Sequence, residues 1–130
     1  MLGAGKAPSK QKKVKTMTKQ PRPPKVHGQT IETSCPCGCV YTTVNDKDGK
    51  PFEVFARLGK SGGCGSTVVN AVCASISISL RSGGDIKDHI KGIEGISCHR
   101  PPGFDNGKQI FSCVDAIAKA IKSTIDQEEY

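Results

Sequence analysis

Hydrophobic and polar residues alternate through the first half of the folded region, which is the pattern of half-buried strands. The alternation covers residues 29–33, 40–45 and 52–58, and these runs are rich in β-branched and aromatic residues. The Asp48-Gly49 pair between the last two runs is a strong signal for a tight hairpin. We therefore expect a small antiparallel sheet built from hairpin strands.

The pattern changes to a helical period after the glycine-rich segment 59–65. A helix is expected over residues 66–81. Its buried stripe is expected to consist of Val68, Val72, Ile76 and Leu80, with Val69 and Cys73 beside it. Glycines then end this helix, and Asp85 is placed to cap a short helix over residues 86–92.

The C-terminal part of the chain predicts a loop followed by a last helix. Residues 95–108 contain Pro101-Pro102, which excludes a helix there. Ser112 is a typical N-cap residue, and Asp115 three positions later completes a capping box. The apolar face of this helix is expected to hold Val114, Ile117, Ala118, Ile121 and Ile125. The predicted fold is α+β: a small antiparallel sheet followed by two to three helices packed on one face.

The positive charge of the chain is concentrated at its N-terminus. Residues 1–30 hold eight Lys or Arg and no acidic residue, whereas the remaining residues hold eleven basic and twelve acidic groups. We expect a disordered basic tail and linker over residues 1–28 and a folded domain over residues 29–130. The Lys-rich stretch 6–25 either attracts the phosphates of nucleic acid or is a solvated linker.

Seven cysteines suggest a site that uses reduced thiols. The chain has no signal-peptide-like or membrane-spanning apolar run, so we expect a cytoplasmic protein. Four cysteines lie at the ends of predicted elements and can converge on one point: Cys37, Cys64, Cys98 and Cys113. Four thiolates suit Zn²⁺ or an iron–sulfur cluster. Cys64 and Cys113 also stand at predicted helix N-termini, where the helix dipole lowers the pKa of a thiol.

Other interpretations of the cysteines stay open. Cys35 or Cys39 can replace Cys37 as a ligand, and the same thiols can be inert core residues or a redox group instead. Cys73 falls within the buried helical stripe and is expected in the core. His99 is a fifth candidate ligand, but we expect it to be an exposed loop residue.

The segment GKSGGCGST between a strand and a helix is a candidate nucleotide or anion site. Its expected contacts are Arg57, Lys60, Ser61, Gly62, Gly63 and Ser66. The spacing does not fit a Walker loop, because Val54 stands where that motif needs glycine. The alternative is a tight strand-to-helix turn around Cys64.

The motifs CGCVYTTVN (37–45), GKPFEVFARLGKSGGC (49–64), ISISLRSGGD (76–85), IKGIEGISC (90–98) and SCVDAIAKAI (112–121) carry a family resemblance. Together they resemble the TSCPD domain, a C-terminal module of adenosylcobalamin-dependent (class II) ribonucleotide reductases that also occurs alone. Val114 stands where the name-giving proline is expected. The CGST and CVDAIAKAI segments are similar, more weakly, to iron–sulfur cluster scaffold proteins, which supports the same α+β fold.

The resemblance implies an accessory or split-off module, because 130 residues are too few for the reductase barrel. The first interpretation is a metal-binding docking domain without independent catalysis, which meets a reductase catalytic chain, a second copy of itself or nucleic acid. The second is a subunit of ribonucleotide reduction that acts in trans, with adenosylcobalamin bound only by the partner reductase. The third is a small nucleotide-binding protein that uses the loop 59–66.

Overall fold

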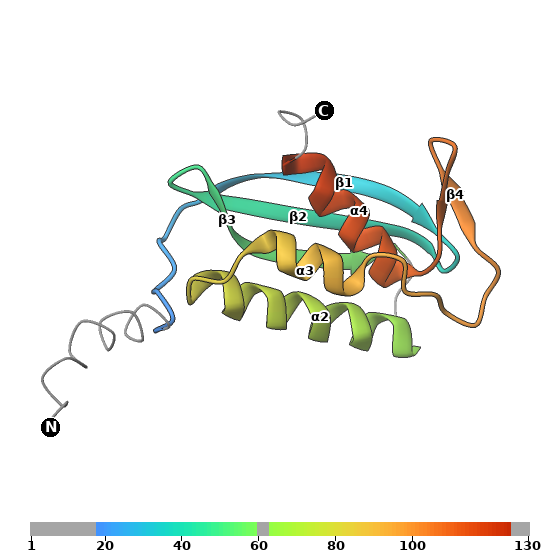
Figure 1. The fold of residues 1–130 in the computed structure, drawn as a ribbon, viewed down its shortest axis with the longest axis horizontal. Coiled ribbons are helices and arrows are strands. Elements are labelled where there is room, and N and C mark those ends of the chain that lie inside the picture. The colour runs from blue at the N-terminus through green and yellow to red at the C-terminus, as the bar shows by residue number, and fades with distance from the viewer. Residues whose placement is uncertain (1–17, 60–62, 126–130) are drawn as a thin grey trace, which may run out of the picture.

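The computed structural model of the chain describes residues 18–59 and 63–125 (Figure 1). The strands and helices in these ranges are β1 (His27–Cys35), β2 (Gly38–Lys47), β3 (Lys50–Leu58), α2 (Gly63–Arg81), α3 (Ile86–Ile93), β4 (Gly103–Asp105), β5 (Lys108–Ile110) and α4 (Cys113–Ile125). Within the described residues no helix is both long enough and apolar enough to cross a membrane.

Strands β1, β2 and β3 pair in chain order as an antiparallel sheet within the described residues. The β2–β3 connection turns at Asp48 and Gly49, which both have positive φ values of 55° and 79°. Two consecutive residues of this kind form the type I′ turn whose twist matches that of the flanking strands. The predicted hairpin is therefore confirmed.

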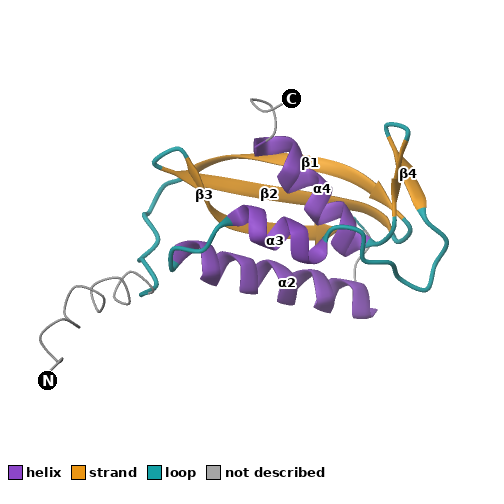
Figure 2. Ribbon diagram, in the orientation of Figure 1, coloured by secondary structure: helices purple, strands orange, loops and turns teal. Residues whose placement is uncertain are grey.

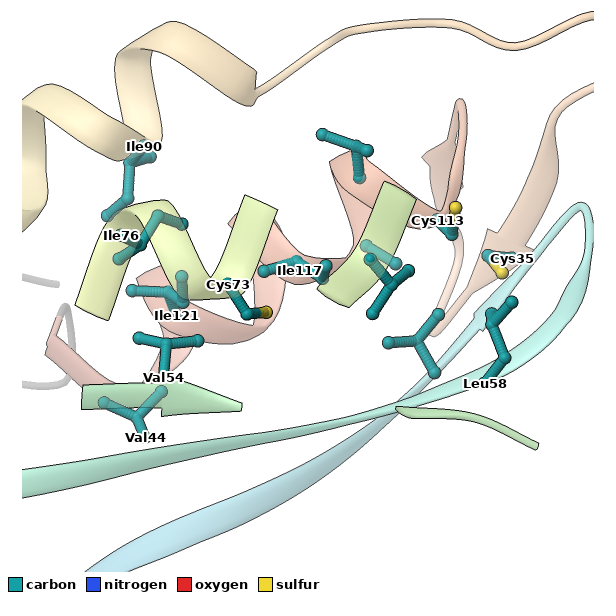
Figure 3. Packing of buried hydrophobic residues seen from close by; sticks show 14 of the residues in the cluster. Cys35, Val44, Val54, Leu58, Cys73, Ile76, Ile90, Cys113, Ile117 and Ile121 are labelled. Carbon is teal, nitrogen blue, oxygen red and sulfur yellow. The ribbon is translucent and has the colours of Figure 1, made fainter. Parts of the chain in front are cut away.

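The helices cover one face of this sheet, so the predicted α+β architecture is confirmed (Figure 2). Helix α2 packs on β3, α4 packs on β1 and β2, and α3 packs against α4. Figure 3 shows the apolar side chains that meet between the two layers. They include Val44, Val54 and Leu58 from the sheet, Cys73 and Ile76 from α2, Ile90 from α3, and Ile117 and Ile121 from α4.

The buried stripe of α2 differs from the predicted one by a rotation of the helix. Val69, Cys73, Ile76 and Leu80 are buried. Val68 is 43% exposed, so its predicted place in the core is wrong. The apolar run of the sequence is wider than the face that β3 covers, and packing against the sheet decides which of the two neighbouring valines is buried. The expected core position of Cys73 is confirmed.

The predicted loop 95–108 contains a second hairpin that the prediction missed. Strands β4 and β5 pair through a turn at Asn106 and Gly107, whose φ values are 52° and 80°. Asn-Gly is a preferred type I′ pair, so the signal was present in the sequence. Each strand has three residues, too few to show an alternating pattern.

Candidate functional site

Four segments that are far apart in the sequence meet at one end of the molecule. Figure 1 shows the β1–β2 turn, the β4 hairpin and the first turns of α2 and α4 at this end. The N–H of Gly59 donates to the carbonyl of Cys39 at 2.8 Å, which brings the end of β3 beside the β1–β2 turn. The N–H of Cys98 donates to the carbonyl of Phe111 at 3.2 Å, which places Cys98 beside the start of α4.

The N-terminus of α4 holds the preceding loop through two side chains. Ser112 Oγ accepts the N–H of Asp115 at 3.0 Å and donates to the carbonyl of Ile96 at 2.6 Å, which confirms Ser112 as a cap. The Asp115 carboxylate accepts the N–H of Gly95 at 2.7 Å and that of Phe111 at 3.0 Å. In a capping box this carboxylate would accept the backbone N–H of the N-cap residue, Ser112. It instead accepts the N–H of Phe111, the residue before the N-cap.

Asp115 is fully buried, yet it stays ionised. Burial by itself raises its pKa. The hydrogen bonds from the N–H groups of Phe111 and Gly95, together with the Lys119 ammonium 2.9 Å from Asp115 Oδ1, lower the pKa and outweigh burial. The pKa of Asp115 therefore lies below its ordinary value. This charge fixes the loop that carries Cys98 against the helix that begins with Cys113.

The thiol of Cys113 is buried at the first position of α4. Burial raises its pKa above the ordinary value, and electrostatic interactions with Cys37 and Cys98 raise it further. The N–H groups of Cys113 and Val114 act in the opposite direction but are outweighed. The predicted lowering of this pKa by the helix N-terminus is therefore wrong, because burial has the larger effect. Cys113 thus lies within electrostatic range of both Cys37 and Cys98.

Cys35 lies in the same group of thiols. Figure 3 shows its side chain near that of Cys113. Burial raises the pKa of Cys35 to about 11, although a hydrogen bond from the Cys37 backbone lowers it. Cys39 has different surroundings: a hydrogen bond to Glu32 is the main reason that its pKa is raised. Strand alternation directs Cys39 to the sheet face away from the helices. Of the two cysteines that could replace Cys37 as a ligand, Cys35 is therefore the one that lies near Cys113.

The predicted metal ligands are therefore only partly described. Cys37, Cys98 and Cys113 come from three elements at one end of the molecule, and Cys64 belongs to the first turn of α2 at that end. The side chain of Cys64 lies outside the described residues. Among the residues that are described, no three Cys, His, Asp or Glu side chains are arranged to hold a metal ion. The four-cysteine site remains a prediction, and His99 is exposed as expected.

The predicted nucleotide site falls largely outside the described residues. Lys60, Ser61 and Gly62 are not described, and Gly63 is the first residue of α2. Ser66 is half-buried in the first turns of α2. Arg57 is exposed on the sheet face that the helices do not cover, so it points away from α2. This site also stays a prediction.

One groove had no signal in the sequence. It has a volume of about 500 Å³ and lies between β1, the β4–β5 hairpin and α4. Its polar lining carries both signs of charge, including Glu94, Lys119 and Lys122. Glu94 forms ion pairs with both Lys119 and Lys122, so the groove does not present charge of a single sign to a ligand.

Comparison with protein families identifies the family of this chain. The sequence profile of the TSCPD domain matches residues 10–125. No curated protein and no solved structure matches the chain. The expected similarity to iron–sulfur scaffold proteins therefore remains a prediction.

Proposed function

This chain belongs to the TSCPD family, and on that premise we propose that it is an accessory module of class II ribonucleotide reduction. The module has no catalysis of its own, binds a metal ion through cysteine thiolates, and docks on a reductase catalytic chain that binds the adenosylcobalamin. Domains of this family are found in ribonucleotide reductases.

One observation supports the metal site above the others. Cys113 interacts electrostatically with Cys37 and Cys98, although the three residues come from α4, the β1–β2 turn and the loop before β4. The first turn of α2, which contains Cys64, begins at the same end. Four thiols from four elements would tie together an aliphatic core that contains no tryptophan.

The buried thiols fit a metal better than they fit free nucleophiles. Burial keeps the Cys113 thiol protonated at neutral pH, which makes it a poor nucleophile. A zinc ion displaces such protons and stabilises the thiolates that burial disfavours. The hydrogen bond from the Cys37 backbone to Cys35 would also favour the thiolate form of Cys35.

The test is the metal content of anaerobically purified protein. We expect about one zinc per chain in the wild type and much less in Cys98→Ser and Cys113→Ser. Cys39→Ser is the matched control, because Cys39 lies on the hairpin that contains Cys37 but faces away from the helices. Equal metal content in all four proteins, or no metal in the wild type, would overturn the metal site.

Docking is tested separately with a class II reductase chain that lacks this domain. We expect the two chains to elute together in size-exclusion chromatography, with no reductase activity from the module alone. If the module also raises the turnover of the catalytic chain, it acts as a subunit in trans. Separate elution at concentrations of tens of micromolar would contradict the docking proposal.

A further inference from the structure

The three-stranded sheet has a second side, which the helices do not cover. Strand alternation turns Val40, Thr42 and Val44 of β2 toward the helices and the residues between them toward the opposite side. Two rows of aligned residues cross that opposite side from β1 to β3. We call these two rows the open face: Thr30, Thr43 and Phe55 in one row, and Glu32, Tyr41 and Arg57 in the next.

Two aromatic rings are exposed on the open face. Phe55 on β3 is 51% exposed, and Tyr41 on β2 is 36% exposed. They stand on adjacent strands in neighbouring rows, so they are diagonal neighbours with Cα atoms about 7–8 Å apart. The chain has only two Tyr and four Phe, and two of these six rings stand on a side of the sheet that the core does not use. Exposed apolar groups that gather in this way mark a surface for protein contact.

The next row on this side of the sheet is covered by the chain itself. Arg22 Nε lies 2.9 Å from Glu53 Oε1, and Asn45 Nδ2 donates to the other oxygen of the same carboxylate at 2.7 Å. Glu53 and Asn45 form the row that follows Thr43 and Phe55, and Glu53 is 1% exposed. The segment before β1 therefore occupies this row, whereas the two rows of the open face stay uncovered.

Opposite charges stand on the two sides of Tyr41. Glu32 on β1 and Arg57 on β3 are exposed and belong to the same row. Two strand spacings, about 10 Å in total, separate the backbones of Glu32 and Arg57. In the described part of the chain neither charge has an ion-pair partner, and Glu32 accepts one hydrogen bond, from the Tyr41 hydroxyl at 3.4 Å. The row thus presents an acid, a ring and a base in that order.

This order of charges makes the open face complementary to itself. Two sheets that pack face to face lie about 10 Å apart, with their strands within about 30° of each other. A two-fold axis that runs between them along β2 places β1 of each copy over β3 of the other and keeps every row at its own height. Glu32 of each copy then faces Arg57 of the other, and the two Tyr41 rings meet at the axis. A patch that matches its own copy in this way is what an isologous dimer requires.

We infer that this protein forms a homodimer in which the open faces of two copies pack together. A face with one sign of charge would repel its own copy, whereas here each acid meets a base. Phe55 of each copy packs over Thr30 of the other, which removes both exposed rings from water. Two rows on three strands make a small interface, and small interfaces are typical of weak complexes, so the dimer dissociates on dilution. This inference does not depend on the metal site or on docking to a reductase.

The test is sedimentation equilibrium of the full-length protein over a hundredfold range of concentration that ends in the millimolar range. The wild type should change from monomer to dimer within this range. Glu32→Lys and Arg57→Glu should each weaken dimerisation by roughly tenfold or more, because each creates two like-charge contacts in every dimer. Asp88→Lys is the matched control, because Asp88 is an exposed acid on α3, which lies on the other side of the sheet. Circular dichroism checks that each variant is folded.

A mixture of the two charge variants tests the two-fold arrangement itself. In a mixed dimer the introduced lysine faces the introduced glutamate, and the unchanged Arg57 of one chain faces the unchanged Glu32 of the other. Equimolar Glu32→Lys and Arg57→Glu should therefore associate about as tightly as the wild type, although each alone stays monomeric. Phe55→Ser leaves both charges in place and should also weaken the dimer, because it removes the exposed ring.

Three results would overturn the proposal. The first is a wild type that stays monomeric over the whole range of concentration, which would leave the open face to a different partner. The second is a wild-type dimer that Glu32→Lys, Arg57→Glu and Phe55→Ser weaken no more than Asp88→Lys does, which would place the dimer contact on another surface. The third is a pair of charge variants that remain monomeric when they are mixed, because their charges would then not meet across a two-fold axis.

Discussion

Replacing Asp115 with Asn tests whether one buried carboxylate holds the loop before β4 against α4. Asn keeps the shape of the side chain but has one acceptor oxygen and a donor NH₂ in place of two acceptors. Either Gly95 or Phe111 would then direct its N–H at a donor. A buried N–H without a hydrogen-bond acceptor costs about 1–3 kcal/mol of stability. The N–H that still has an acceptor now bonds to a neutral amide and not to a carboxylate, which costs about 1 kcal/mol more.

The expected loss is therefore about 3 kcal/mol, a large part of the roughly 5–15 kcal/mol of a typical domain. Urea unfolding followed by circular dichroism at pH 7 measures it. Asp85→Asn is the matched control, because Asp85 caps α3 through one bond to the N–H of Lys87, and Asn caps equally well. A loss below about 1 kcal/mol, no larger than that of Asp85→Asn, would refute the role given to Asp115.

The stability difference between wild type and Asp115→Asn should depend on pH in a direction that the structure fixes. The folded protein lowers the pKa of Asp115, so its ionised form contributes stability at every pH above the unfolded value of about 3.9. That contribution is lost as the pH falls through the lower folded value. The difference in stability between wild type and Asp115→Asn should therefore be constant from pH 7 to 5 and shrink in stronger acid. A difference that grows on acidification would contradict the assignment.

Three further predictions rest on other parts of the fold. Glu53→Gln should lower the free energy of unfolding by about 1–2 kcal/mol at pH 7, because its buried carboxylate accepts charge-assisted hydrogen bonds, and an unchanged urea midpoint would contradict this. Gly107→Ala should destabilise the fold by about 1 kcal/mol, because the φ of Gly107 is 80°. Gly92→Ala should instead stabilise it by about 0.5 kcal/mol, because Gly92 lies in α3 with open space for a methyl group. Melting temperatures that shift in the same direction for both variants would count against this. Burial raises the pKa of Cys73 to about 12, so an alkylating reagent at pH 8 should modify Cys39 of the native protein long before Cys73. Equal rates of modification at the two cysteines, measured by mass spectrometry, would show that Cys73 is not buried.

The sequence carried a local signal for nearly every element, including one that the prediction passed over. Period-two and helical patterns, the Asp48-Gly49 turn and the Ser112 cap are local features, and each has its expected effect in the structure. The Asn106-Gly107 turn carried the same kind of signal as Asp48-Gly49. The family could also be identified from motifs within the chain, and the profile match over residues 10–125 agrees with it.

The tertiary structure decided what depends on burial and on contacts between distant segments. Packing against β3 buried Val69 and left Val68 exposed, although the sequence pattern placed Val68 in the buried stripe and Val69 beside it. Burial of Cys113 reversed the sign of its predicted pKa shift, because desolvation exceeds the effect of the helix N-terminus. The hydrogen bond between Gly95 and Asp115, and the strand pairing that brings Tyr41 beside Phe55 on an uncovered face, join residues whose separation along the chain gives no local pattern.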